Sequence, residues 1–321
     1  MQGQKNILLA AQVDYKKYCS DALELLQQKG FKVILNESGL PLHRECLETI
    51  ADRLDGVVAG TEKWDSRMIA LARRLKVIAR FGVGVDNIDL KAAKEHGIVV
   101  TNTKGLNTDA VSDMTVCFMI CLLKKAVAAD RLMHKGIWER QIGMNLCGKT
   151  VGIIGFGDIG RRVCKKLSGF DCKMIAYDKY PDEKIAGILN VTLTGFEEVL
   201  KNSDIISLHL PYLPETNHII GAKEISLMKD GAYLVNTARG SLVDEKALYD
   251  ALKAGKLAGA ALDVFEEEPC GADHPLLGLD NVICTPHMAG ASAETFSYGG
   301  MVTARAIIDV FEGRTPKNAL T

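Results

Sequence analysis

The strongest constraint on the fold of this chain is a glycine-rich turn between an expected strand and an expected helix. Residues 151–154 (Val-Gly-Ile-Ile) favour a buried parallel strand. Gly155, Gly157 and Gly160 follow in the spacing G-x-G-x-x-G. Apolar residues then recur at helical spacing, at Ile159, Val163, Cys164 and Leu167. The glycines therefore stand where a strand turns into a helix.

Each glycine has its own task in a turn that binds a dinucleotide. Gly155 permits the tight turn, Gly157 lets the backbone approach a pyrophosphate, and Gly160 lets the helix lie close to the strand. The N–H groups at the start of the helix then point at the phosphates. The alternative is that these are ordinary turn glycines. However, strand, glycines, helix, strand and acid follow in the order that a βαβ unit requires.

The acid of this motif stands about 20 residues after the glycines, at the end of the next strand. Residues 173–177 (Lys-Met-Ile-Ala-Tyr) predict that strand, and Asp178 follows it. A carboxylate there can accept hydrogen bonds from both ribose hydroxyls of the adenosine. Its charge repels a 2′-phosphate, so the sequence favours NAD over NADP. Taken alone, Asp178 could also be an ordinary polar residue at a strand end.

The composition is that of an ordinary globular protein, and 321 residues suggest two domains. A formal net charge of -1 gives no electrostatic footprint for nucleic acid or for an anionic membrane. Nine cysteines without C-x-x-C spacing indicate reduced thiols and a cytoplasmic protein. The first residues lack the apolar run of a signal peptide, and the longest apolar run, 114–123, is too short to span a bilayer.

Strands alternate with helical patterns along the whole chain, which predicts two doubly wound parallel sheets of the α/β class. The first part lacks the glycine motif, and its strands are expected at 7–11, 31–35, 56–59 and 76–80. Further strands of the second part are expected at 204–208, 232–236, 258–262 and 281–284. Residues 107–135 favour one long helix, too apolar for a surface helix, that crosses into the second domain. A closing helix at 291–311 is expected to pack back on the first domain.

Ligands of open α/β sheets bind beyond the carboxyl ends of the strands, so polar residues directly after the expected strands are candidates for chemistry. Arg239 lies in a loop before a helix that Asp244 would cap, and His287 follows a proline that ends the last strand. The candidates are Asp178, the segments His209-Leu210-Pro211 and Thr237-Ala238-Arg239-Gly240, Asp263 and His287.

Five segments in combination resemble the D-isomer-specific 2-hydroxyacid dehydrogenases, which include phosphoglycerate dehydrogenase and the glyoxylate and hydroxypyruvate reductases. They are 80–89, 151–160, 236–244, 262–269 and 285–290. The resemblance implies an NAD-dependent oxidoreductase that interconverts a D-2-hydroxy acid and its 2-oxo acid, working as a homodimer. It also implies a Rossmann NAD-binding domain at 104–287 and a flavodoxin-like substrate and catalytic domain at 1–103, completed by about 288–321.

The resemblance assigns three catalytic side chains. Arg239 would bind the carboxylate and carbonyl of the 2-oxo acid, a task suited to a planar cation. His287 would be the general acid in reduction and the base in oxidation, with Glu268 as its partner. Hydride delivery to a ketone leaves an alkoxide, so a proton donor that works near neutral pH is needed. A carboxylate beside the imidazole favours its charged form.

The resemblance also implies contacts with cofactor and substrate. The cofactor contacts would be Gly155, Gly157, Asp158, Ile159, Gly160, Asp178, Pro211, Thr216, Thr237, Ala238 and Asp263. The substrate contacts would be Val83, Gly84 and Asn107, with the backbone N–H groups of the first two as donors.

Less specific interpretations exist for these residues. An arginine after a strand is more often a surface ion-pair residue, and the run 266–268 would usually be a solvated turn. His287 could be an interior histidine, and we interpret His209 as structural. The remaining histidines show no spacing typical of metal ligands, so no metal site is predicted. They are His43, His96, His134, His218 and His274.

The chain departs from the usual family pattern in two places. Val111-Ser112-Asp113 stands where Val-Ala-Glu is usual, and the loop 59–63 lacks the basic residues that bind phosphate in some phosphoglycerate dehydrogenases. Lys63 and Arg80 could stand in for them, so substrate identity stays open. The rival function is an NAD-sensing corepressor of the C-terminal-binding-protein kind. Formate dehydrogenase is more distant, because it would need another residue at Glu268.

Overall fold

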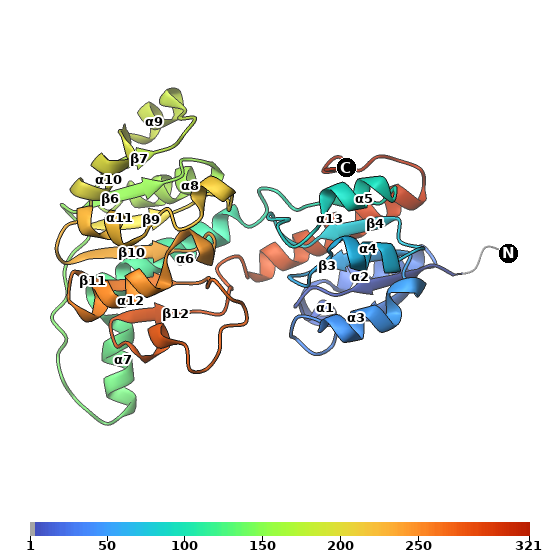
Figure 1. Ribbon diagram of the computed structural model, residues 1–321, viewed down its shortest axis with the longest axis horizontal. Helices are drawn as coiled ribbons and strands as arrows, with labels where there is room; N and C mark the ends of the chain where they lie inside the picture. The colour runs from blue at the N-terminus through green and yellow to red at the C-terminus, as the bar shows by residue number, and fades with distance from the viewer. Residues whose placement is uncertain (1–3) are drawn as a thin grey trace. The chain divides into compact units, whose positions relative to one another are not determined.

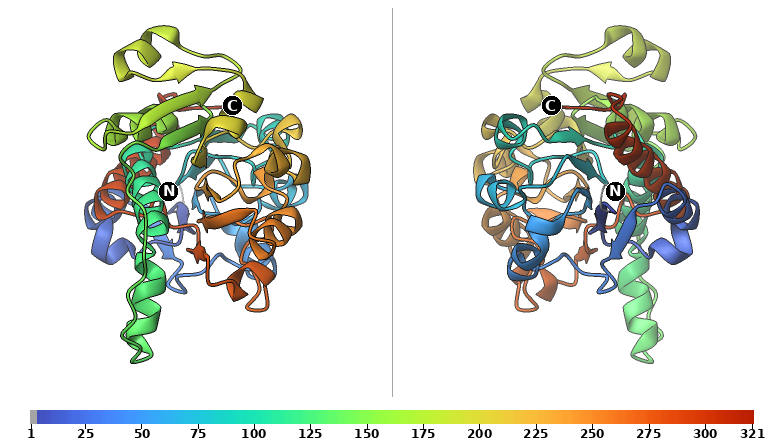
Figure 2. Two further views of the ribbon diagram at one scale, coloured as in Figure 1. Left: turned by 90° about the vertical axis from the view of Figure 1, so that its left-hand side faces the viewer. Right: turned by 90° about the vertical axis from the view of Figure 1, so that its right-hand side faces the viewer.

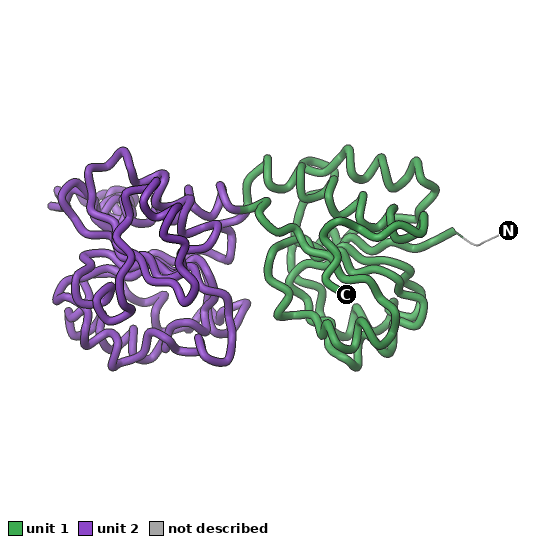
Figure 3. The backbone as a smooth tube through the Cα atoms, turned by 90° about the horizontal axis from the view of Figure 1, so that it is seen from above, with its two compact units in different colours: residues 1–107, 291–321 green, residues 108–290 purple. Residues whose placement is uncertain are grey.

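The computed structural model describes residues 4–321 and consists of two compact units (Figure 3). Unit 1 combines the chain up to residue 107 with 291–321, and unit 2 is 108–290. The divisions fall after residues 107 and 290, where the sequence had suggested 103 and 287. Both units are parallel α/β sheets covered by helices, which confirms the expected fold class.

Unit 1 has a five-stranded parallel sheet with the order β2-β1-β3-β4-β5. This order is that of flavodoxin-like folds. The strands are β1 (Asn6–Leu9), β2 (Lys32–Leu35), β3 (Gly56–Ala59), β4 (Val77–Arg80) and β5 (Val99–Thr101). The helices are α1 (Tyr15–Tyr18), α2 (Ser20–Gln28), α3 (Arg44–Ile50), α4 (Ser66–Leu71), α5 (Leu90–Glu95) and α13 (Ala293–Phe311), with a short 3-10 turn, η1 (Ala51–Arg53).

Alternation along the strands of unit 1 sends apolar side chains to both faces of its sheet. Leu8 packs on one face with residues of α3 and α4, whereas Ile7 and Leu9 pack on the other with residues of α2 and α13. The helix α13 therefore belongs to the core of unit 1, although it lies at the other end of the chain (Figure 1).

Unit 2 has a seven-stranded parallel sheet with the order β12-β11-β10-β9-β6-β7-β8. Its first six strands in sequence have the Rossmann order, and β12 is added at one edge. The strands are β6 (Thr150–Ile154), β7 (Lys173–Tyr177), β8 (Thr192–Leu193), β9 (Ile205–Leu208), β10 (Ala232–Asn236), β11 (Leu257–Leu262) and β12 (Val282–Cys284).

Helices cover both faces of this second sheet. Val151 and Ile153 face a core shared with α6 and α8, and Ile154 faces a core shared with α10 and α12. The helices are α6 (Thr108–Lys124), α7 (Ala126–His134), α8 (Asp158–Leu167), α9 (Glu183–Leu189), α10 (Phe196–Asn202), α11 (Ala222–Leu227) and α12 (Glu245–Lys253). Three short 3-10 turns are η2 (Pro214–Thr216), η3 (Gly240–Leu242) and η4 (Pro275–Gly278).

The expectation of one helix over 107–135 was wrong, because the segment forms two helices, α6 and α7. Lys125 between them has a left-handed backbone with φ 53°, which an α-helix cannot continue. Most apolar residues of α6 are buried within unit 2, against α8 and the sheet, whereas α7 has no buried residue. Figure 2 shows α7 extending past the sheet of its own unit. Between residues 4 and 321, no helix has the length and apolar character needed to span a membrane.

Candidate active site

The glycine turn between β6 and α8 has the predicted geometry. Gly155 has φ 100°, and a Cβ there would lie 2.6 Å from the main-chain carbon of His209. A Cβ at Gly160 would collide with the carbonyl oxygen of Gly155, so the helix can approach the strand only with glycine there. At Gly157, by contrast, an added Cβ would meet nothing within 4 Å. The turn therefore leaves open space at the start of α8, where a pyrophosphate can approach.

The first turn of α8 and the end of β7 complete the dinucleotide site. Asp158 and Ile159 form the first turn of α8, whose N-cap, Gly157, makes no side-chain capping bond. The carboxylate of Asp178 lies beside the glycine turn, because its Oδ2 accepts from the Phe156 N–H at 2.7 Å. Its Oδ1 accepts from the Tyr180 N–H at 2.8 Å. These residues fit the phosphates and the adenosine ribose of NAD.

Thr216 shapes the loop after β9, where a cofactor contact is expected. Its hydroxyl donates to the Pro211 carbonyl at 2.9 Å and accepts from the Leu213 N–H at 2.8 Å. The side chain is buried at 8% exposure. Thr216 and Pro211 are therefore brought together, and the hydrogen bond fixes the course of the chain beyond β9.

A histidine and a glutamate pair beyond the carboxyl ends of β11 and β12. Nδ1 of His287 lies 2.6 Å from Oε2 of Glu268, while Oε1 of Glu268 accepts from the Phe265 N–H at 3.1 Å. Burial raises the pKa of Glu268, but the hydrogen bond and charge of His287, the Phe265 N–H and the charge of Arg239 together outweigh it, so the pKa lies below its usual value. The pair leaves Nε2 of His287 as the ring nitrogen that can meet a substrate.

Asp263 at the end of β11 anchors the loop that carries His287. Its Oδ1 accepts from the Thr285 hydroxyl at 2.5 Å and from the Met288 N–H at 2.8 Å, and its Oδ2 accepts from the Ala289 N–H at 2.8 Å. Asp263 is 1% exposed, and this burial raises its pKa although these donors oppose the shift. His287 itself adopts a left-handed backbone with φ 49°. The anchor therefore holds a backbone conformation that few residues adopt unaided.

Arg239 lies in the loop after β10, half-buried, beside the same carboxylate. Its charge is among the influences that lower the pKa of Glu268. Its Nη1 donates to the Ala238 carbonyl at 2.7 Å, and the buried Asn236 donates to the Arg239 carbonyl at 2.7 Å. The structure thus brings Arg239, Glu268 and His287 into one region of unit 2. A cation, an imidazole and a carboxylate in this arrangement can bind an anion and transfer a proton.

Thr237 and Ala238 precede Arg239 and are fixed by their own contacts. The hydroxyls of Thr237 and Thr115 on α6 lie 3.0 Å apart, and the Ala238 N–H donates to Oδ1 of Asn236 at 3.0 Å. Thr237 is buried at 7% exposure. The loop that follows β10 is therefore tied both to α6 and to its own strand.

The three residues expected to touch substrate, Val83, Gly84 and Asn107, belong to unit 1. The Val83 carbonyl accepts from the Asn102 amide at 2.9 Å, and Oδ1 of Asn107 is buried without a hydrogen-bond partner. Nε of Arg80 donates to the Gly84 carbonyl at 3.0 Å and its Nη1 to the Phe81 carbonyl at 2.5 Å. Arg80 therefore braces the glycine-rich turn that carries Val83 and Gly84.

The loop after β3 is held by a buried acid. Glu62 is 4% exposed, and its Oε1 accepts from the Trp64 indole N–H at 3.1 Å and its Oε2 from the Gly60 N–H at 2.9 Å. Burial raises the pKa of Glu62. Lys63 in the same loop is exposed. The loop thus presents a buried acid and a single basic side chain.

The other histidines make no metal centre. Nε2 of His209 lies 3.0 Å from the Ser207 hydroxyl, and burial lowers the pKa of His209 to about 3. His218 pairs with Glu266 and His274 pairs with Glu245, each at 2.9 Å. Within residues 4–321, no group of three or more histidine, cysteine, aspartate or glutamate side chains could hold a metal ion.

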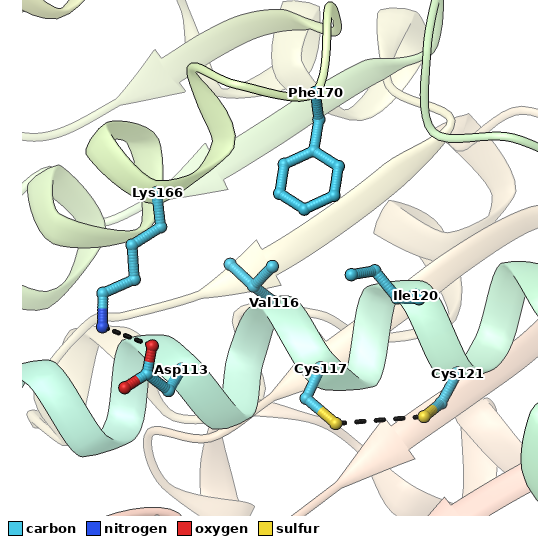
Figure 4. A pocket seen from close by; sticks show the side chains of 7 residues that line it. All are labelled: Asp113, Val116, Cys117, Ile120, Cys121, Lys166 and Phe170. Atoms are coloured by element: carbon cyan, nitrogen blue, oxygen red, sulfur yellow. Dashed lines mark hydrogen bonds and ion pairs between the residues drawn. The ribbon is translucent and has the colours of Figure 1, made fainter.

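An open hollow of about 460 Å³ lies on α6 and α8 (Figure 4), and Arg239, Glu268 and His287 are not among the residues that line it. Its apolar lining includes Val116, Ile120 and Phe170. Sγ of Cys117 and Sγ of Cys121 lie 3.9 Å apart at its margin. An ion pair of Asp113 with Lys166 at 2.6 Å gives the shortened acid a partner on α8.

Glu245 and His274 have a structural task near the site that the sequence did not indicate, and Gly240 was a candidate only as part of the segment 237–240 after a strand. A Cβ at Gly240 would collide with the main chain of Phe265, so the loops of Arg239 and Glu268 touch through their backbones. Glu245 and His274 form a pair beside the segment of Glu268. The one available signal was Gly240 directly after Arg239, since glycine often marks a close backbone approach.

Comparisons with known proteins identify relatives of both units. The model for "D-isomer specific 2-hydroxyacid dehydrogenase, NAD binding domain" matches residues 116–289. A D-3-phosphoglycerate dehydrogenase of Archaeoglobus fulgidus is 40% identical over 303 residues, 94% of this chain and 57% of that protein. A glyoxylate reductase of Thermofilum pendens is 40% identical over 285 residues, 86% of this chain and 84% of that protein.

Solved structures agree with these sequence matches. The crystal structure of the TT0316 protein of Thermus thermophilus has a TM-score of 0.90 and 34% identity, and it covers 98% of this chain and 100% of that one. The chain spans little more than half the length of the phosphoglycerate dehydrogenase that it matches, and most of the glyoxylate reductase.

Proposed function

The chain belongs to the D-isomer-specific 2-hydroxyacid dehydrogenase family, and from this membership we propose that it interconverts a D-2-hydroxy acid and its 2-oxo acid with NAD. The observation that carries the proposal is the pair of His287 and Glu268, whose Nδ1 and Oε2 atoms lie 2.6 Å apart. The positive charge of Arg239 acts on the carboxylate of this pair and helps to lower its pKa. The three side chains lie in unit 2, the unit of the glycine turn. The relatives named dehydrogenases and reductases support this enzymatic function over that of a corepressor.

Arg239 binds the substrate in this mechanism. Its guanidinium offers a planar fork of N–H donors, which matches the carboxylate of a 2-oxo acid. The hydrogen bond from the Asn236 amide to the Arg239 carbonyl fixes the backbone that supports this fork. The role of Arg239 is therefore to orient the carbonyl carbon and to polarise its oxygen.

His287 moves the proton. In reduction, Nε2 of the imidazolium donates to the carbonyl oxygen as charge develops there, and in oxidation the neutral ring takes the proton back. The carboxylate of Glu268 accepts from Nδ1–H, which fixes the ring tautomer and stabilises the charged ring. When bound, NAD supplies the hydride acceptor, and NADH the donor, of the reaction.

The cofactor is held by residues at the ends of several strands of unit 2. Gly157 leaves room for the pyrophosphate in the turn that Gly155 and Gly160 permit, and Asp178 accepts from the adenosine ribose. The further contacts that we propose are Asp158, Ile159, Pro211, Thr216, Thr237, Ala238 and Asp263. Unit 1 is the substrate unit, with Val83, Gly84 and Asn107 as its contacts.

The loop after β3 favours a substrate without a phosphate group. Glu62 in this loop is buried and accepts from the Gly60 N–H, and Arg80 is engaged with the carbonyls of Phe81 and Gly84. Lys63 alone offers an exposed positive charge. We therefore expect glyoxylate or hydroxypyruvate to be used better than 3-phosphohydroxypyruvate.

The test is a panel of 2-oxo acids with NADH, followed at the absorbance of the reduced nicotinamide. The panel contains glyoxylate, hydroxypyruvate, pyruvate, branched 2-oxo acids and 3-phosphohydroxypyruvate. Oxidation of NADH with at least one acid, and its loss in Arg239→Ala, is the expected result. No oxidation with any acid, together with a protein partner that co-purifies, would favour the corepressor instead.

We also propose a homodimer and a cytoplasmic location. Trp138 and Ile142 follow α7 and are 84% and 86% exposed, and the hollow on α6 offers an apolar surface in the same unit. Apolar patches of this kind on one chain suit a second copy. All nine cysteines are free, which suits a reducing compartment. The dimer is tested by analytical ultracentrifugation of the wild type and of the double variant Trp138→Ser, Ile142→Ser. We expect the wild type to sediment as a dimer and the double variant as a monomer.

A further inference from the structure

Two glutamates tie the segment after β11 to the start of α12. The Glu266 N–H donates to Oε1 of Glu245 at 2.9 Å, and the Glu245 N–H donates to Oε1 of Glu266 at 3.3 Å. Oε1 of Glu266 also lies 2.9 Å from Nε2 of His218. Each glutamate therefore holds the main chain of the other, and a histidine supports the pair from the segment after η2.

His274 supports the other end of this arrangement. Its Nε2 lies 2.9 Å from Oε2 of Glu245, and the two side chains are only 17% and 18% exposed. The ring meets that of Phe265 edge to face, with centroids 5.3 Å apart. Nδ1 of His274 is buried without a partner. The tautomer with its hydrogen on Nε2 donates to Glu245 and leaves only a lone pair at Nδ1.

These contacts surround the segment on which Glu268 depends. The N–H of Phe265 holds one oxygen of Glu268 at 3.1 Å, and the other oxygen meets His287 at 2.6 Å. A displacement of residues 265–266 would therefore move the carboxylate relative to the imidazole. The same displacement would reach Arg239, because Gly240 lies against the main chain of Phe265.

We propose that Glu245 and His274 are positioning residues that hold Glu268 in register with His287. They would touch neither substrate nor cofactor, and they act through the main chain of residues 265–266. Proton transfer needs its groups held within about 0.5 Å, and supporting residues are what give a site that precision. The proposal rests on the proposed function, since it assigns a supporting role for that reaction.

The experiment compares full-length variants with the 2-oxo acid that the wild type reduces best. Glu245→Ala is expected to lower kcat by about 10–100-fold, as supporting residues do, with KM changed by less than about threefold. Glu245→Gln keeps an acceptor for the Glu266 N–H and should recover most of kcat.

Glu267→Ala is the matched control, since it removes an exposed carboxylate from the same run, and its kcat should equal that of the wild type. A Glu245→Ala protein with wild-type kcat but a lower melting temperature would overturn the proposal. If Glu245→Ala does not fold, His274→Phe keeps a ring against Phe265, removes the donor and is judged by the same readouts. A wild type that reduces none of the acids would refute the proposed function itself.

Discussion

Two loops of unit 2 each place a histidine just beyond a parallel strand, His209 after β9 and His287 after β12. The ring of His209 lies 3.0 Å from the hydroxyl of Ser207, and burial keeps the ring uncharged by lowering its pKa to about 3. His287 meets the carboxylate of Glu268, and its side chain is 40% exposed.

The difference shows that position at the carboxyl end of a strand does not make a histidine a proton donor. The sheet determines where a histidine lies, but its hydrogen-bond partner and the exposure of its ring decide its protonation state. A buried ring beside a neutral hydroxyl stays uncharged, whereas an exposed ring beside a carboxylate can take up a proton and pass it on. Substitutions in the two loops test this contrast.

Replacement of each histidine in turn should separate the two loops most widely. His287→Ala is expected to lower kcat by about 10²–10⁴-fold, the usual contribution of a general acid, with NADH binding retained. His209→Gln should keep kcat within about tenfold of the wild type, since its ring takes no part in proton transfer. Steady-state kinetics and a fluorescence titration with NADH measure both. Equal losses of kcat would erase the distinction between the loops.

Removal of the carboxylate should make His287 resemble His209. Glu268→Gln keeps a hydrogen-bond acceptor but loses the charge that stabilises the imidazolium, so reduction should slow by about 10–100-fold near neutral pH. Steady-state kinetics of the reduction test this. A wild-type kcat in Glu268→Gln would show that the carboxylate takes no part in proton transfer.

The anchor of the His287 loop has no counterpart at His209. Asp263→Asn places an amide where the N–H groups of Met288 and Ala289 converge, so one donor loses its acceptor. We expect about 1–3 kcal/mol less stability and about tenfold lower kcat. Chemical denaturation and kinetics measure these effects. Ser207→Ala, at the other histidine, is the control and should leave kcat unchanged.

The smallest effect concerns stability in acid. The ring of His209 takes up a proton near its usual value of 6.5 when the chain is unfolded, but only near 3 when folded. Stability therefore falls as the pH drops through this window, by at most about 1.4 kcal/mol per pH unit and less for a partly solvated ring. His209→Asn should show a shallower decline in denaturation at several pH values. An unchanged slope would mean that the ring is solvated when folded.

The features that sequence reasoning predicted are local ones. The turn at Gly155 and Gly157 follows from adjacent residues, and Asp178 follows from the length of one βαβ unit. The pairing of Glu268 with His287 was available only through the resemblance, because nothing in the spacing of 19 residues brings the two together. The strand order that does so is a property of the folded sheet.

What sequence reasoning missed depends on backbone shape and on distant contacts. Neither glycine nor proline occurs at the break between α6 and α7, so no residue type there indicated the left-handed conformation of Lys125. Asp263 was expected only to contact the cofactor, since its donors lie 22 to 26 residues away along the chain. Only the folded structure brings these donors of the His287 loop to the carboxylate of Asp263.

The contact at Gly240 has a consequence for how this protein can diversify. Because no side chain fits between that residue and Phe265, the segments of Arg239 and Glu268 cannot be respaced independently. A mutation that widened the gap for a bulkier acid would disturb proton delivery at the same moment. We therefore expect changes of substrate, natural or engineered, to come from the loops of unit 1, with the segments of Arg239 and Glu268 unchanged.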